Sequence, residues 1–409
     1  MIKSKRILST IAILAAAAGV VDSLIKVDAN KMQIVSDAIE GSPDGRAEYE
    51  FNRIADPATS EVPSNIRMRE LAYASQLPKF GPARDSELSV SFTRIGPYNV
   101  GGRTRAFAID HSNTDVYLAG GVSGGMWKSE DAGESWKRVT APEDHSAVSC
   151  VSQDTRSGKE DVWYYGSGEV SGNSASKSFS AYYRGSGIYK SIDGGESWDL
   201  LPSTAALVHK ATDWDAVFRV LVNPIRNDSD IVYAAMSEGI MRSNDGGVSW
   251  RNSLPANNAT FTDLKMTSTG TLYAAISADG GGNNKGFWRS EDGFVWNEIT
   301  PDGFPNSFGR TLISIYPGDE TRLYFLSVTP GTGTSSNSLW KYRYLSGDGT
   351  GTGGIWYDRS SGLPIEDLNL YNGYCQVLAV KPDNEDMVYV CLLYTSDAAD
   401  DMQCVDLGG

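Results

Sequence analysis

The chain lacks an excess of basic charge. Its 36 Lys and Arg stand against 51 Asp and Glu, which gives a net charge of −15 at neutral pH. Proteins that bind nucleic acid displace counterions from phosphates with a field of positive charge, and this composition offers none. The same acidic balance argues against attachment to anionic membranes. We therefore expect neither nucleic acid nor a membrane surface as a partner.

Cysteine and histidine are scarce as well, with four and three residues. The histidines are scattered and no two cysteines have CxxC spacing, so the sequence indicates no zinc site, and we expect no metal and no cofactor. A Gly-rich loop leading into Gly-Lys-Ser/Thr, which would hold phosphate, is also missing. Cys150 and Cys375 fall on equivalent strands of two different repeats, which argues against a disulfide between them.

Long apolar runs are missing except at the start, in MIKSKRILSTIAILAAAAGVV. Three basic residues precede the apolar run Ile7–Val21, which is too short to span a bilayer. This pattern is typical of a secretory signal, so residues 1–29 are predicted to be a signal peptide. We expect an exported protein, secreted or at the cell surface, with no membrane span after cleavage.

A polar arm is predicted for residues 30–92. Within it, SNIRMRELAYASQ (64–76) begins with a Ser/Asn cap and has loosely helical spacing of its apolar residues, while prolines flank it on both sides. This pattern predicts a short helix in an extended arm packed on the following domain. A disordered linker is the alternative.

The ending CLLYTSDAADDMQCVDLGG (391–409) breaks every pattern before it. It resembles the translation of a sequencing adapter read through into a contig. We interpret residues 391–409 as an artefact of this kind, and we expect the natural protein to continue beyond residue 390.

Glycine and aromatic residues are plentiful, at 43 Gly and 10% aromatics, which favours an all-β fold with many turns. One phrase returns: KSEDAGESW (128–136), KSIDGGESW (190–198), RSNDGGVSW (242–250) and the clipped RSEDGFVW (289–296). Their aspartates are 62, 52 and 47 residues apart. Three short strands precede each phrase and one follows it. Units of four strands over about 50 residues are typical of propeller blades.

The sequence therefore predicts a β-propeller over residues 93–390, with five complete blades and part of a sixth. Each phrase is expected to close the turn between the third and fourth strands. The aspartate accepts backbone N–H groups, a glycine supplies positive φ, and the tryptophan buries its ring between sheets. The clipped copy is expected to have a different turn geometry. The residues assigned this structural role are Ser129, Asp131, Gly133, Trp136, Ser191, Asp193, Gly195, Trp198, Ser243, Asp245, Gly247, Trp250, Ser290, Asp292 and Trp296.

These phrases resemble the Asp-box or BNR repeat of sialidases, xyloglucan-cleaving propeller hydrolases, sortilin-type receptor ectodomains and photosystem assembly factors. A narrower likeness is to large secreted propeller proteins of Bacteroidota, often exported by a type IX system with a C-terminal sorting domain. The stretches IGPYNVGGRTRAFAID (95–110), GSGEVSG (166–172) and DPATSEVPSNIRMRELAYASQLP (56–78) carry it. The first resemblance implies the propeller fold, and its members include both hydrolases and pure binders.

Catalysis has weak support in the sequence. Glycoside hydrolysis usually needs two carboxylates. The xyloglucan-cleaving propellers carry one in an Arg-Thr-Asp-x-Gly-Gly phrase of the first blade, whereas GGVSGG (120–125) places Val122 there. The arginine cluster of sialidases has no assignable counterpart. The G-x-S-x-G string at 121–125 lies between two strands, not at a strand-to-helix turn, and so indicates a loop.

The candidate binding residues lie in loops. Glu169 opens a long polar insertion (166–187) that ends in aromatic and basic side chains, and such an insertion can form a wall of a binding cleft. A flexible Gly pair precedes two arginines at the start of the first blade. The candidates are Glu169, Arg103, Arg105, Tyr182, Tyr183 and Arg184. The structural alternatives are that Glu169 caps a turn and that the arginines pair with acidic loops.

Taken together, these features favour an exported propeller that binds a polypeptide or a glycan through loops on one face, and not an enzyme. The first alternative is a glycoside hydrolase, active on polysaccharides, with part of its site in the missing blades. The second is a structural module of a larger surface protein.

Overall fold

The computed structural model describes residues 51–63, 66–76, 102–141, 144, 146–169, 183–206, 213–256, 259, 261–277, 283–330, 336–363, 373–374, 376–393 and 402–406. The expected signal peptide lies outside this part of the chain. Contacts divide the chain into two units, residues 1–66 with 174–181, and residues 67–173 with 182–409. All of the sheets belong to the second unit. No helix in the described ranges is long and apolar enough to cross a membrane.

The described strands form six antiparallel sheets, in each of which strands consecutive in the chain are hydrogen-bonded neighbours. The first sheet contains β1 (Thr104–Ile109), β2 (Tyr117–Gly121), β3 (Gly125–Ser129) and β4 (Lys137–Arg138). The second contains β5 (Val148–Gln153), β6 (Trp163–Ser167), β7 (Ile188–Ser191) and β8 (Asp199–Leu200). The third contains β9 (Val217–Val222), β10 (Val232–Met236), β11 (Gly239–Ser243) and β12 (Arg251–Pro255).

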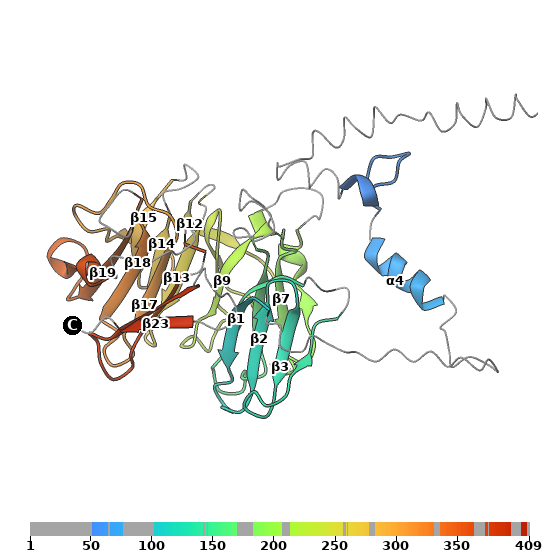
Figure 1. The fold of residues 1–409 in the computed structure, drawn as a ribbon, viewed down its shortest axis with the longest axis horizontal. Helices are drawn as coiled ribbons and strands as arrows, with labels where there is room; N and C mark the ends of the chain where they lie inside the picture. The colour runs from blue at the N-terminus through green and yellow to red at the C-terminus, as the bar shows by residue number, and fades with distance from the viewer. Residues whose placement is uncertain are drawn as a thin grey trace, which may run out of the picture. The chain divides into compact units, whose positions relative to one another are not determined.

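The remaining three sheets repeat this order, as Figure 1 shows for several of their strands. The fourth contains β13 (Thr262–Met266), β14 (Leu272–Ile276), β15 (Gly286–Ser290) and β16 (Asn297–Glu298). The fifth contains β17 (Thr311–Ile315), β18 (Arg322–Val328), β19 (Asn337–Tyr344) and β20 (Gly354–Asp358). The sixth contains β21 (Val377–Val380), β22 (Val388–Leu393) and β23 (Met402–Asp406).

Helical structure is minor. The helix α4 (Ile66–Gln76) falls within the stretch that was predicted to be helical. Short 3₁₀ helices in the described ranges include η1 (Pro202–Thr204), η2 (Asp213–Asp215), η4 (Gly351–Gly353) and η5 (Ser360–Gly362).

Successive sheets pack through their first strands, since β1 contacts β5, β5 contacts β9, β9 contacts β13, β13 contacts β17, and β17 contacts β21. Sheets of consecutive antiparallel strands that stack through their first strands are the blades of a β-propeller. The first strands therefore surround the axis. The prediction of five four-stranded blades and part of a sixth is confirmed.

The sixth sheet reaches into the segment that we interpret as adapter-derived. Its strand β23 pairs with β22, for example Val405 with Val390. An edge strand offers backbone N–H and C=O groups to any extended segment, so this pairing requires no particular origin for residues 391–409.

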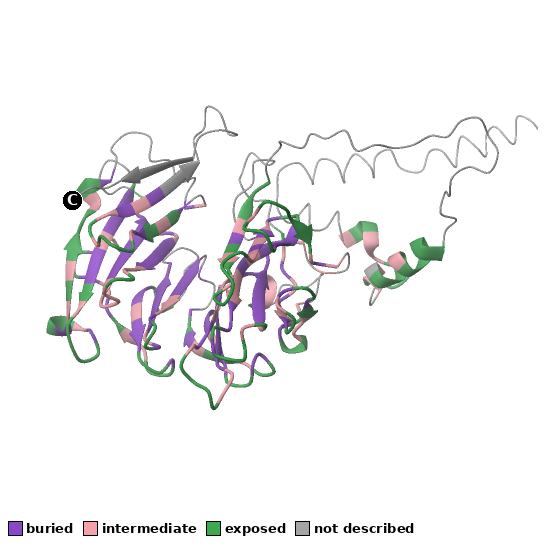
Figure 2. Ribbon diagram, turned by 90° about the horizontal axis from the view of Figure 1, so that it is seen from below, coloured by how far each residue is buried: buried purple, intermediate pink, exposed green. Residues whose placement is uncertain are grey.

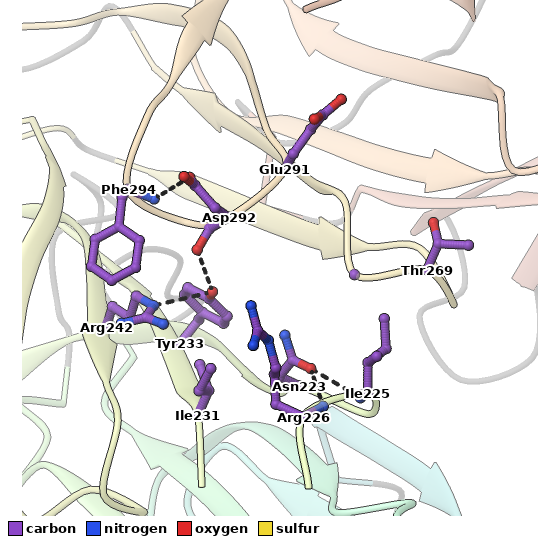
Figure 3. Close-up of a pocket in the computed structure, with 11 residues that line it drawn as sticks. Asn223, Ile225, Arg226, Ile231, Tyr233, Arg242, Thr269, Glu291, Asp292 and Phe294 are labelled. Atoms are coloured by element: carbon purple, nitrogen blue, oxygen red, sulfur yellow. Dashed lines mark hydrogen bonds between the residues drawn. The ribbon is translucent and has the colours of Figure 1, made fainter. Parts of the chain in front are cut away.

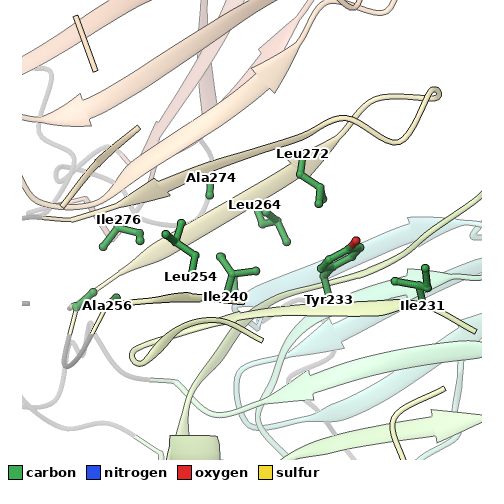
Figure 4. Close-up of a cluster of buried hydrophobic side chains, with 11 residues drawn as sticks. Ile231, Tyr233, Ile240, Leu254, Ala256, Leu264, Leu272, Ala274 and Ile276 are labelled. Carbon is green, nitrogen blue, oxygen red and sulfur yellow. The ribbon is translucent and has the colours of Figure 1, made fainter. Parts of the chain in front are cut away.

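The core lies between neighbouring blades, and Figure 2 shows buried residues concentrated on the strands and exposed residues on the turns. One cluster joins blades 3 and 4, where Ile240 and Leu254 face Leu264 and Leu272 (Figure 4). Small residues let the sheets approach closely near the axis. A Cβ on Gly166 of β6 would lie 2.7 Å from a methyl group of Val217 on β9, the next blade's first strand.

The turn after the third strand has the hydrogen bonds expected of its aspartate. In blade 2, Asp193 Oδ1 accepts the N–H groups of Glu196 and Ser197 at 3.1 and 3.0 Å, and the hydroxyl group of Ser191 at 2.7 Å. Gly195 has a φ of 83°. The clipped turn of blade 4 differs as expected, because Asp292 accepts the N–H groups two and three residues later, at Phe294 and Val295.

The tryptophan expectation is correct for Trp198, which is buried against blade 1. It is wrong for Trp136, which stays 38% exposed. We call the repeated turn phrase the box. The box tryptophan of one blade packs against the blade before it, and blade 1 has no earlier blade in the described part of the chain. Position in the series therefore decides the burial of this side chain.

A second repeated contact joins several blades to the next, and no sequence motif indicated it. A tyrosine of the second strand donates its hydroxyl to a turn carbonyl of the following blade. Tyr164 reaches Gly246 at 3.3 Å, and Tyr324 reaches Glu385 at 2.8 Å. Blade 1 is joined to blade 2 by an ion pair instead, in which Lys128 Nζ lies 2.6 Å from Glu196 Oε1.

The box aspartates make stability depend on pH. Burial acts to raise the pKa of Asp245, but hydrogen bonds from Ser249 and Ser243 outweigh it and hold the pKa at about 2, against an ordinary value of 3.8. Because the folded-state pKa is the lower one, this group stabilises the fold above pH 4, and the contribution disappears as the pH falls from about 4 to 2.

We therefore expect Asp245→Asn to lower stability at pH 7 and to flatten the loss of stability below pH 4. Urea unfolding between pH 2 and 7 measures both effects. The matched control is Asp228→Asn, since the Asp228 side chain is 73% exposed. An unchanged acid slope in Asp245→Asn would contradict the role given to this carboxylate.

Candidate functional site

The two edges of every blade differ. Because the strands alternate in direction, the first strands begin at the edge where the second strands end, and the box turns lie at the opposite edge. We call the first edge the axial face and the second the box face. The axial face collects charged side chains close to the axis.

At the axial face, residues from three blades meet. Arg105 at the start of β1 pairs with Glu169, which follows β6, with Nε to Oε2 at 3.2 Å. Arg105 also donates to the carbonyl of Tyr374 at 2.8 Å, and its guanidinium carbon lies 4.3 Å from the centre of that ring. Arg103 donates to the Tyr374 hydroxyl group. We call Arg103, Arg105, Glu169 and Tyr374 the mouth cluster.

Two side chains of the mouth cluster are largely shielded from solvent. The Glu169 side chain is 4% exposed and that of Arg105 is 20% exposed. Burial, together with the neighbouring Glu169 carboxylate, raises the pKa of Tyr374 to about 12, so its hydroxyl group stays protonated near neutral pH. The cluster therefore presents arginine N–H groups and a protonated phenol at the end of the axis.

The other candidate residues of the insertion are placed differently. Tyr183 pairs with Glu169 through the backbone, with N–H to O distances of 2.7 and 2.9 Å, and its side chain is 47% exposed. Arg184 lies 3.9 Å from Asp215 and not in the mouth cluster. Tyr182 lies outside the described residues. The bridge from Glu169 to Tyr183 closes the base of the insertion.

Deeper on the axis lie charged residues that the sequence analysis missed. They come from β9, from β13 and from the residue before β17, and they are Arg219, Asp263, Lys265 and Arg310. We call them the axial cluster. Each stands in or beside a first strand whose other residues are largely apolar. The signal available in the sequence was a charged residue inside an otherwise apolar first strand. Such a residue can lie at the axis, because one side of each first strand faces it.

The turn between β2 and β3 contains two residues that bear on the question of catalysis. Val122, which the resemblance aligns with an aspartate of the xyloglucan-cleaving propellers, is buried, and its N–H donates to the carbonyl of Arg103 at 3.0 Å. Ser123 lies in the hairpin turn between β2 and β3, as expected of a loop. Within the described residues, no group of three or more His, Cys, Asp or Glu is arranged to hold a metal ion.

A hollow of about 290 Å³ opens at the box face between blades 3 and 4 (Figure 3). The Arg242 guanidinium carbon lies 4.0 Å from the centre of the Phe294 ring, and its Nε donates to the hydroxyl group of Tyr233 at 3.3 Å. The clipped turn supplies Phe294, so the irregular repeat and the hollow coincide. We call this region the box-face hollow.

No protein-family model and no curated protein matches the chain. Solved structures do. The Niastella koreensis GH74 enzyme is 20% identical with a TM-score of 0.47, and the match covers 70% of this chain and 43% of that one. YCF48 from Cyanidioschyzon merolae is 12% identical with a TM-score of 0.45, and the match covers 76% and 86%. A YCF48 structure bound to D1 peptide is 16% identical with a TM-score of 0.43, and the match covers 71% and 76%.

The chain spans less than half the length of that GH74 enzyme. At these identities the likeness concerns the fold alone. The protein is a β-propeller. That statement rests on its sheets and on the contacts between their first strands, and the propeller carries its charged side chains at the axial face.

Proposed function

We propose that this protein is an exported or cell-surface propeller that binds a polypeptide or a glycan at its axial face. The observation that carries the proposal is the mouth cluster, in which Arg105, Glu169 and Tyr374 come from three different blades and contact one another. Buried charges that converge from separate loops are typical of binding sites.

A glycoside hydrolase is the alternative hypothesis. One of its two carboxylates would have to act as a proton donor, which requires a raised pKa. Asp263, the carboxylate deeper on the axis, has the opposite shift: burial acts to raise its pKa, but Arg219 and Lys265 hold it below the ordinary value. The position of the hydrolase aspartate is occupied by the buried Val122. The binding function is therefore favoured.

Peptide and glycan arrays probed with the purified protein test the proposal. We expect a ligand whose binding is lost in Glu169→Gln and Arg103→Ala but kept in Lys137→Ala, a cation beside the box turn of blade 1. Loss of binding in all three variants would contradict an axial-face site. Sugar release from xyloglucan, other plant and host glycans or sialyl substrates would instead support the hydrolase.

A further inference from the structure

The axis carries more positive than negative charge, in contrast to the acidic chain as a whole. Within the described residues of the mouth and axial clusters, the cations are Arg103, Arg105, Arg219, Lys265 and Arg310. The anions are Glu169 and Asp263. A local excess of buried or half-buried cations is costly unless an anion compensates it.

Both carboxylates are already engaged. Glu169 pairs with Arg105. Asp263, which is 4% exposed, accepts from Arg219 Nη2 at 2.9 Å, and its other oxygen accepts the N–H of Ile313 at 2.9 Å. Neither has capacity to neutralise the remaining cations as well.

Neither Lys265 nor Arg310 has a hydrogen bond to a carboxylate among the described residues. Arg310 donates to the carbonyls of Gly373 and Tyr374, both at 2.9 Å, and its guanidinium carbon lies 5.4 Å from the centre of the Phe261 ring. The Lys265 ammonium, on β13, has no hydrogen-bonding partner among the residues that the structure describes. No described residue therefore competes with a ligand for the three donors of this ammonium group.

The electrostatics agree with this geometry. Repulsion from Arg219 and burial lower the pKa of Lys265 to about 8. Burial and the neighbouring Arg105 lower the pKa of Arg310 to about 9. Both groups hold their protons less firmly than usual because burial and neighbouring cations disfavour their charged forms. A bound anion would restore the balance.

We propose that Lys265 and Arg310 bind a carboxylate of an acidic polypeptide, so that the ligand of the axial face is a peptide and not a neutral glycan. This inference rests on the proposed function. The Lys265 ammonium and the Arg310 guanidinium are donors, and they match the acceptor oxygens of carboxylates and peptide carbonyls. The hydroxyl groups of a neutral sugar also need acceptors, and both carboxylates here are committed to arginines.

The test measures the affinity of the full chain for fluorescent deca-glutamate and deca-glutamine peptides by anisotropy at two salt concentrations. We expect deca-glutamate to bind and deca-glutamine to bind at least about tenfold more weakly, with added salt weakening the acidic peptide most. Lys265→Gln should weaken deca-glutamate about tenfold. The matched control is Arg226→Gln at the box-face hollow, where the side chain is 62% exposed, and it should leave the affinity unchanged.

The pH profile of the wild-type chain gives a readout that does not depend on a variant folding. The charged groups near Lys265 are Arg219 on β9 and Asp263 on β13. Since the ammonium must be protonated to bind, affinity for deca-glutamate should fall as the pH rises from 7 to 9, where the peptide carboxylates do not titrate. Lys265→Arg should keep the affinity and flatten this fall.

The outcomes separate the two proposals. Equal binding of both peptides, with loss in Glu169→Gln, would overturn the carboxylate inference and leave the axial-face site standing. Tighter binding of an oligogalacturonate than of deca-glutamate would overturn the choice of a polypeptide. Failure of every peptide and glycan to bind would overturn both proposals and favour a structural module.

Discussion

Phe287→Ala is expected to lower the free energy of unfolding by about 3–5 kcal/mol, the range found when a buried aromatic side chain is deleted. Phe287, on β15, is fully buried. Its ring lies 4.5 Å from that of Phe325 on β18 and 4.8 Å from that of Phe304, centre to centre. The side chain therefore joins blade 4 to blade 5, and its removal leaves a cavity between two rigid sheets that cannot close around it.

Chemical denaturation of the wild type and the variant at neutral pH measures the loss. The matched control is Phe107→Ala on β1, because Phe107 is 56% exposed and its ring contacts only that of Tyr117 among the described aromatic residues. The control should lose about 1 kcal/mol or less. Similar losses in the two variants would show that the interface between blades 4 and 5 is not where the structure places it.

Asp263→Ala is expected to cost about 3 kcal/mol, the lower end of the range for breaking a buried ion pair, because the Arg219 side chain remains 30% exposed. The variant removes the carboxylate that faces Arg219 and Lys265, and it leaves the Ile313 N–H without its acceptor. Repulsion among the axial cations then acts without compensation. Urea unfolding at pH 7 measures the effect.

Salt tests the cause of that loss. Because the expected penalty is repulsion between cations, added salt should recover part of the stability of Asp263→Ala, while Asp228→Ala at the surface should change by less than about 0.5 kcal/mol at any salt concentration. If Asp263→Ala were as stable as the wild type, the axial cluster would not carry the charge imbalance on which the peptide inference depends.

The blades could be predicted from the sequence because their signals are local and repeated. The Asp193 carboxylate, Gly195 and Trp198 lie within six residues, and each acts on the turn or strand where it stands. The burial of Trp136 could not be predicted from the box, since it depends on which sheet precedes blade 1. Local chemistry specifies a turn, while the neighbouring blade decides burial.

The axial face could be predicted only in part. Arg103, Arg105 and Glu169 were selected for their loops, but their contact with Tyr374 joins residues more than 200 positions apart in the chain. Arg219 and Lys265 were overlooked because they lie in strands that otherwise indicate a core. A basic residue can lie in a surface loop or in a first strand that lines the axis. The sequence does not distinguish these two positions, because the axis forms only when the blades pack around it.

The alternation of strand direction has a consequence for assembly. The mouth cluster lies at the axial face of blades 1, 2 and 6, and the box-face hollow lies at the opposite face, between blades 3 and 4. A five-residue strand such as β10 spans about 17 Å. An occupant at one end leaves the other end open to solvent. The length of the strands therefore sets the separation between a ligand at the axial face and the box turns.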